Sequence, residues 1–257
     1  MSKITAYREG VPCWVDLTAA DPVRAAAFYG SLFGWEFTEI GADGGHYRLA
    51  TLRGVRVAGI APQQPGEESG PAAVWNTYLA AEDVDRTVAK VRDAGGGVLV
   101  EPVEVLDFGR MAVVVDPAGA VVGLWQGRTH GGSGLANEPG AFTWNENLST
   151  DPRVARGFYQ QVFGYTYDDV AGMDYSVFKV AGAMAGGIGG QPSMIPPGTT
   201  SFWSVYFAVT DTDLKAAQVV DLGGRILVPP ADTPYGRMSV VRDDAGAAFC
   251  LIAPPRG

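Results

Sequence analysis

The sequence predicts an α+β protein made of four βαβββ modules that form two homologous domains. Three observations predict this: the second half repeats motifs of the first, each half alternates strand-like and helix-like segments, and the chain contains 35 Gly and 17 Pro residues. Gly and Pro at this frequency, without a three-residue period, are typical of short strands joined by tight turns.

The internal repeat extends over most of the chain. Phe28-Tyr29 and Phe33-Gly34-Trp35 recur at one constant offset as Phe158-Tyr159 and Phe163-Gly164-Tyr165. After one small gap, Trp75-Asn-Thr-Tyr78 matches Trp203-Ser-Val-Tyr206. After a second, Gly109-Arg110-Met111 matches Gly236-Arg237-Met238, and Asp116-Pro-Ala-Gly119 matches Asp243-Asp-Ala-Gly246. Such agreement indicates duplication, with domains at 1–129 and 138–257. The linker at 130–137 is Gly-rich, so we expect it to be flexible.

The first module begins with a strand at 11–18, where Trp14, Asp16 and Thr18 share one face by the two-residue period. Asp21-Pro22 has the pattern of an N-cap followed by a proline in the first helical turn, and Gly34 ends the predicted helix. Further strands are expected near 35–40, 45–52 and 55–61.

The second module repeats this order. A strand is expected at 74–81, and a helix begins at Asp83 and ends at Gly95. Its inward face is expected to carry Val84, Val88 and Val91. Strands follow near 97–103, 110–115 and 120–126. The second half of the chain has the same order, with helices near 151–163 and 211–222.

These motifs together resemble the vicinal oxygen chelate superfamily, which includes glyoxalase I, extradiol dioxygenases, fosfomycin-resistance enzymes and bleomycin-resistance proteins. The resemblance rests on the strand, the helix ending in Phe-Tyr-x-x-x-Phe-Gly-Trp, the later Gly-Arg and the Asp-Pro-x-Gly hairpin, and it covers both domains. The two-domain form looks most like actinobacterial proteins labelled glyoxalase-like or hydroxylase. The resemblance implies that paired modules curl into cupped, antiparallel-rich sheets, each with a ligand chamber on its concave face.

The resemblance also implies where metal ligands would stand. They would lie seven residues before each helix-opening Asp and seven after the Asp of the hairpin turn, which gives Trp14, Trp144, Asn76, Ser204, Gly123 and Cys250. None is a His or a carboxylate, the donors that such metals need. The two histidines, His46 and His130, are expected in surface loops. No metal site and no cofactor is therefore predicted, although a divalent metal on rearranged ligands remains an alternative.

Two matched carboxylates follow the first of these positions. Asp16 and Glu146 lie two residues further along their strands and are expected to face the same chambers. Among aromatic side chains a carboxyl has a raised pKa, which suits a general acid or base. Alternatively, each is hydrogen-bonded to Tyr or Arg in the chamber wall. Arg110 and Arg237 are the candidate partner charges, or they are structural residues of a turn.

Large aromatic side chains recur on the same strands in both halves. They favour a pocket for flat, apolar or conjugated molecules, although they could equally fill the core. With the neighbouring amide, the predicted ligand-binding residues besides the two arginines are Trp14, Trp75, Asn76, Tyr78, Trp125, Trp144, Trp203 and Tyr206.

Charge and hydropathy exclude other classes of partner. The net charge of −9 is divided almost equally between the halves, so no basic face for nucleic acid is expected. No apolar stretch is long enough for a membrane span, and the first residues lack the apolar core of a signal peptide. We therefore expect a cytoplasmic monomer or homodimer with Cys13 and Cys250 reduced.

Three functions remain open. The first is a metal-free binding protein for a small aromatic or apolar metabolite or drug. The second is a metal-independent hydroxylase-like or isomerase enzyme in which Asp16 or Glu146 transfers a proton. The third is a metal-dependent lyase or dioxygenase with rearranged ligands. The sequence leaves open whether the protein is an enzyme.

Overall fold

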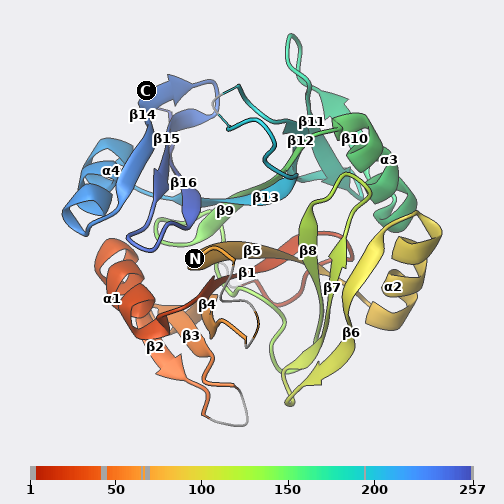
Figure 1. Ribbon diagram of the computed structural model, residues 1–257, viewed down its shortest axis with the longest axis horizontal. Coiled ribbons are helices and arrows are strands. Elements are labelled where there is room, and N and C mark those ends of the chain that lie inside the picture. The colour runs from red at the N-terminus through yellow and green to blue at the C-terminus, as the bar shows by residue number, and fades with distance from the viewer. Residues whose placement is uncertain (1–3, 42–44, 65, 67–69, 194, 256–257) are drawn as a thin grey trace.

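The computed structural model describes residues 4–41, 45–64, 66, 70–193 and 195–255. Within these residues the chain forms two eight-stranded mixed sheets and four α-helices (Figure 1). Each sheet comes from one half of the chain, and each half runs βαβββ twice. The α+β class and the four-module order are confirmed.

The first sheet has the order β2-β3-β4-β1-β5-β8-β7-β6. Its two central strands, β1 and β5, are antiparallel, and each pairs on its other side with a parallel strand, β4 or β8. The elements of this half are β1 (Pro12–Ala19), α1 (Pro22–Phe33), β2 (Glu36–Glu39), β3 (Arg48–Leu52), β4 (Val55–Pro62), β5 (Ala73–Ala80), α2 (Val84–Asp93), β6 (Gly97–Val105), β7 (Gly109–Val115) and β8 (Val121–Gly127).

The second sheet repeats the first in the order β10-β11-β12-β9-β13-β16-β15-β14. Its central strands, β9 and β13, are again antiparallel. The elements are β9 (Phe142–Ser149), α3 (Pro152–Phe163), β10 (Thr166–Asp169), β11 (Tyr175–Val180), β12 (Ala183–Gly190), β13 (Phe202–Ala208), α4 (Thr212–Asp221), β14 (Arg225–Thr233), β15 (Gly236–Arg242) and β16 (Ala248–Ala253).

The helices begin and end where the sequence predicted. The Asp21 carboxylate accepts hydrogen bonds from the backbone N–H groups of Val23 and Arg24, and Gly34 ends α1 in the left-handed conformation at φ 72°. At α3, the Asp151 carboxylate accepts a hydrogen bond from the Val154 N–H, and Gly164 ends the helix in the left-handed conformation. In the described part of the chain, no helix has both the length and the apolar character that crossing a membrane requires.

The two sheets pack against each other through one face. On β1 this face carries Val15 and Leu17, which share a core with Phe207 of β13 and Phe249 of β16. At the two sides of the molecule α1 lies beside α4, and α2 lies beside α3 (Figure 1). Each of the two larger cores therefore joins a module of one domain to a module of the other, and the opposite face of each sheet is left for other contacts.

The Gly-rich linker is packed against the first sheet. Ser133 and Leu135 are buried, the Ser133 N–H donates to the Cys13 carbonyl, and the Gly134 N–H donates to the Arg56 carbonyl. The expectation of a flexible linker is therefore wrong, because these backbone bonds hold the segment against β1 and β4.

Candidate functional site

A cavity of about 890 Å³ lies on the outward face of the first sheet. Leu49 of β3 and Leu99 of β6 both line it although they come from opposite sides of the sheet, so the sheet is strongly curved around it. Its volume is in the range of small-molecule sites. The structure thus provides the cupped sheet and the chamber that the resemblance implied for the first domain.

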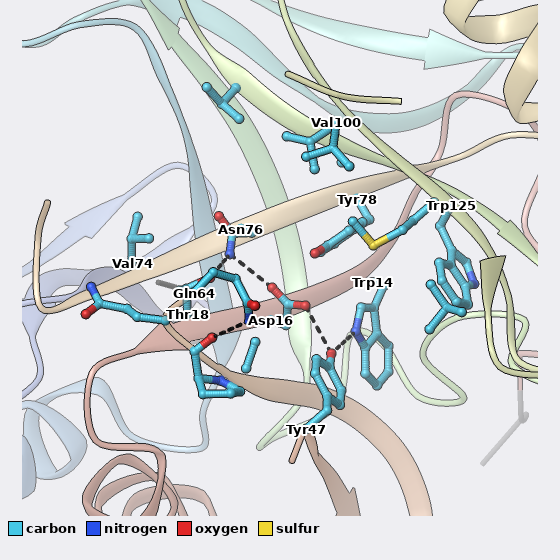
Figure 2. A pocket seen from close by; sticks show the side chains of 18 of the residues that line it. Trp14, Asp16, Thr18, Tyr47, Gln64, Val74, Asn76, Tyr78, Val100 and Trp125 are labelled. Atoms are coloured by element: carbon cyan, nitrogen blue, oxygen red, sulfur yellow. Dashed lines mark hydrogen bonds between the residues drawn. The ribbon is translucent and has the colours of Figure 1, made fainter. Parts of the chain in front are cut away.

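Asp16 lies in the wall of this cavity (Figure 2). It stands opposite Asn76 in the register of β1 and β5, and the Asn76 side-chain amide donates hydrogen bonds to Asp16 Oδ1 at 3.0 Å and to Thr18 Oγ1 at 2.9 Å. The Tyr47 hydroxyl donates to Asp16 Oδ2 at 3.0 Å. The predicted position of Asp16 at the chamber is therefore correct.

Burial changes the acidity of this carboxyl. Asp16 is 4% exposed, and desolvation raises its pKa to about 6, although hydrogen bonds from Asn76, Tyr47 and Tyr78 offset part of the increase. Near neutral pH it can therefore accept or release a proton.

Tyr47 links Asp16 to Trp14. The Trp14 indole N–H donates to the Tyr47 hydroxyl at 2.9 Å, and the same hydroxyl donates to Asp16 (Figure 2). Our interpretation of the sequence missed Tyr47. The available signal was its recurrence as Tyr175, which accepts the same bond from Trp144 in the second domain.

His130 is the second residue that was missed. It was expected at the surface of the linker, but it is 5% exposed, lines the cavity, and meets the Trp14 ring edge-on at 4.4 Å between centroids. Trp125 also lines the cavity, and its indole N–H donates to the His130 carbonyl at 2.7 Å. Burial lowers the pKa of His130 to about 4, so its imidazole is neutral at neutral pH.

His46 lies at the surface, as expected, beside Glu39.

The second sheet carries a related but different group of residues. The Tyr206 hydroxyl donates to Glu146, which is buried, and desolvation raises the pKa of that carboxyl. Cys250 stands where the first domain has Gly123, next to Ser204, with 3.7 Å between Sγ and Oγ. Burial raises the pKa of the Cys250 thiol to about 12, so the thiol is protonated.

Two predicted ligand-binding tryptophans have other positions. Trp75 and Trp203 point away from the outward faces into the cores, where their indole N–H groups donate to the hydroxyls of Tyr29 and Tyr159. The structure therefore places both tryptophans in the core, which is the alternative that the sequence left open. A strand alternates its side chains, so Trp75 cannot share a face with its neighbour Asn76.

The two arginines are not partners of the buried carboxylates. Arg110 forms ion pairs with Asp85 and Glu104, and Arg237 forms ion pairs with Asp213 and Asp232. The alternative that both arginines are structural residues therefore explains their positions. The hydrogen-bond partners of Asp16 and Glu146 are neutral side chains instead.

The donors around Asp16 do not fit the divalent metal of the superfamily. They comprise one carboxylate, one amide and two phenols, and the amide and the Tyr47 hydroxyl direct hydrogens toward the carboxylate oxygens. At Gly123, a β-carbon would lie 2.1 Å from the Tyr78 ring, so that ring occupies the space of a side-chain ligand. Among the described residues no group of three His, Cys, Asp or Glu side chains is arranged to hold a metal ion.

Comparison with known proteins identifies the family. The Glyoxalase/Bleomycin resistance protein/Dioxygenase superfamily matches residues 13–124 and 148–251, and the chain belongs to this superfamily. It is 44% identical over 260 residues to "Putative glyoxylase CFP32" of Mycobacterium tuberculosis, covering 99% of this chain and 98% of the relative. It is 34% identical over 263 residues to "Anthracycline biosynthesis protein DnrV" of Streptomyces peucetius, covering 97% and 95%.

Solved structures share the fold at low sequence identity. The Mn(II)-bound glyoxalase from Novosphingobium aromaticivorans has a TM-score of 0.67 at 18% identity, covering 96% of this chain and 82% of that one. The 2,3-dioxygenase LapB from Pseudomonas sp. KL28 has a TM-score of 0.67 at 12% identity, covering 97% and 94%. At these identities the likeness shows the two-domain fold alone.

Proposed function

We propose that this protein binds a flat aromatic or apolar small molecule in the chamber of the first domain, without the metal of its superfamily. The observation that carries the proposal is the cavity of about 890 Å³ whose wall combines Trp14, Phe108 and Trp125 with the carboxylate of Asp16. Aromatic walls stack flat ligands, and a few polar groups orient them. Two relatives are named for anthracycline biosynthesis, and an anthracycline contains fused, flat rings of the kind that such walls suit.

Calorimetric titration with 2-naphthalenemethanol tests this proposal, using protein that has been dialysed against EDTA and analysed for metal by mass spectrometry. We expect binding of one equivalent per chain with unchanged affinity after chelation. Leu99→Trp should abolish it, because Leu99 lines the cavity and is 58% exposed, so a larger side chain fills the chamber without disturbing the core. Leu227→Trp on β14 is the matched control, since Leu227 stands at the corresponding position of the second sheet and is also exposed.

Binding that survives Leu99→Trp and disappears in Leu227→Trp would place the ligand in the wrong domain for this proposal. One bound metal per chain, with binding lost on chelation, would favour the metal-dependent lyase or dioxygenase instead.

A second candidate function is proton transfer by Asp16 on a ligand in the same chamber. The raised pKa of about 6 favours it, since a general acid or base works best near the ambient pH. The probe is 2-tetralone, a flat aromatic ketone with acidic α-hydrogens, whose exchange in deuterium oxide is followed by NMR. Exchange faster than in buffer, lost in Asp16→Asn, supports this activity. Binding of 2-tetralone without accelerated exchange contradicts it.

A further inference from the structure

The described residues of the chamber wall include one carboxylate and no basic side chain that could neutralise it. Among the described residues that line the cavity, Asp16 is the only Asp, Glu, Lys or Arg. The nearby imidazole of His130 is neutral near pH 7, because burial lowers its pKa to about 4. The chamber wall therefore carries a negative charge when Asp16 is ionised.

Asp16 also lacks a cationic partner behind the wall. No ion pair within the described part of the chain includes it, and its hydrogen bonds come from the neutral groups of Asn76, Tyr47 and Tyr78. The guanidinium of Arg56 stacks on Phe108 at 5.3 Å from the ring centroid and donates to the Thr129 carbonyl, so it is engaged elsewhere. A buried carboxylate without a counter-ion is costly, and a cation brought by the ligand would remove part of that cost.

We propose that the chamber selects flat aromatic ligands that carry a cationic ammonium group, with Asp16 as the counter-ion, and rejects ligands that carry a carboxylate or phosphate. This inference rests on the proposed binding function and adds the charge of the ligand to it. Trp14 and Leu49, which are buried and apolar, also line the cavity, and such surroundings strengthen a charge-assisted hydrogen bond at Asp16.

Three probes of one shape separate charge from binding: 2-naphthylmethylamine, 2-naphthalenemethanol and 2-naphthoate. At pH 7.5 we expect the protonated amine to bind at least about tenfold more tightly than the alcohol, and the carboxylate to bind most weakly. Asp16→Asn should remove the preference for the amine. Asp168→Asn is the control, because it removes one negative charge from an exposed position on β10.

A pH series on the unaltered protein tests the inference without any substitution. The titratable groups that face Asp16 across the chamber are Tyr47, Tyr78 and His130; burial holds the two phenols protonated and the imidazole neutral between pH 5 and 8. Of these groups and Asp16, Asp16 alone changes charge in this range. Affinity for the amine should therefore increase several-fold from pH 5 to pH 8, while affinity for the alcohol stays constant.

The outcomes distinguish the two proposals. If none of the three probes binds, the proposed binding function fails. If the alcohol or the carboxylate binds as tightly as the amine, or if the amine shows no pH dependence, binding stands and the charge selection is overturned.

Discussion

The hydroxyl of Tyr47 occupies the space that a β-carbon on Gly59 would need. An ideal β-carbon at Gly59 would lie 1.8 Å from the Tyr47 oxygen, so only glycine on β4 leaves room for this ring. Through that space Tyr47 reaches Trp14 and Asp16. The absence of a side chain at Gly59 is thus required for the hydrogen bonds through which Tyr47 orients the Asp16 carboxylate.

Gly59→Ala is expected to displace Tyr47 and break both of its hydrogen bonds. We expect the free energy of unfolding to fall by about 1–3 kcal/mol and the affinity for 2-naphthalenemethanol to fall as well, measured by urea unfolding and calorimetry. Gly41→Ala is the control, because a β-carbon there meets no atom within 4 Å. Equal behaviour of the two variants would show that Tyr47 does not depend on Gly59.

Trp14 and Trp75, which lie on opposite faces of the first sheet, should have separable roles. Trp14→Phe removes a donor at the cavity, so it should weaken ligand binding. Trp75→Phe removes the donor to Tyr29 in the core, so it should lower the free energy of unfolding by about 1–3 kcal/mol and leave affinity unchanged. Fluorescence titration and urea unfolding measure the two effects. A loss of affinity in Trp75→Phe comparable to that in Trp14→Phe would contradict this division.

Asp16 should make stability depend on pH. Its pKa increases from 3.8 to about 6 on folding, so the folded state binds the proton more tightly. The free energy of unfolding should therefore fall as the pH rises from about 4 to about 6, by up to about 3 kcal/mol from this group. Asp16→Asn removes the contribution, which urea unfolding across this range will detect. If the free energy of unfolding of Asp16→Asn had the same pH profile as that of the unaltered protein, this contribution of Asp16 would be ruled out.

His130 should act in the opposite direction. Its pKa falls from 6.5 to about 4 on folding, so the unfolded state binds the proton more tightly and stability is lost as the pH falls through this range. His130→Phe keeps an aromatic ring beside Trp14 and removes the titration. Relative to the unaltered protein, the pH slopes of His130→Phe and Asp16→Asn should change with opposite signs. Slopes that change in the same direction would contradict the assignment.

Gly157 offers a stabilising substitution. It lies in the interior of α3, is exposed, and a β-carbon there would meet no atom within 4 Å. Gly157→Ala should raise the free energy of unfolding by about 0.5–1 kcal/mol, since alanine loses less backbone entropy in a helix. Thermal unfolding checks this, with Gly30→Ala for comparison: there the β-carbon would lie 3.3 Å from the Trp35 carbonyl oxygen, so a smaller gain or a loss is expected.

Much of the fold followed from local signals in the sequence. The duplication is visible because it copied whole motifs, and the helix ends are visible because Asp21 and Gly34 act within a few residues of the backbone groups they satisfy. The face of β1 that carries Trp14 and Asp16 also followed from the two-residue period. The same period, applied to β5, would have separated Trp75 from Asn76.

Only the tertiary structure decided how the chamber is completed. Tyr47 and His130 reach Trp14 from a loop and from the linker, and nothing in their local sequence encodes that approach. The structure likewise decided that Arg110 pairs with Asp85 rather than with Asp16. Strand and helix periodicity is a property of neighbouring residues and can be predicted from them. The burial and partners of a side chain depend on segments far away in the chain, so they emerge only when the sheet curves and the two domains pack together.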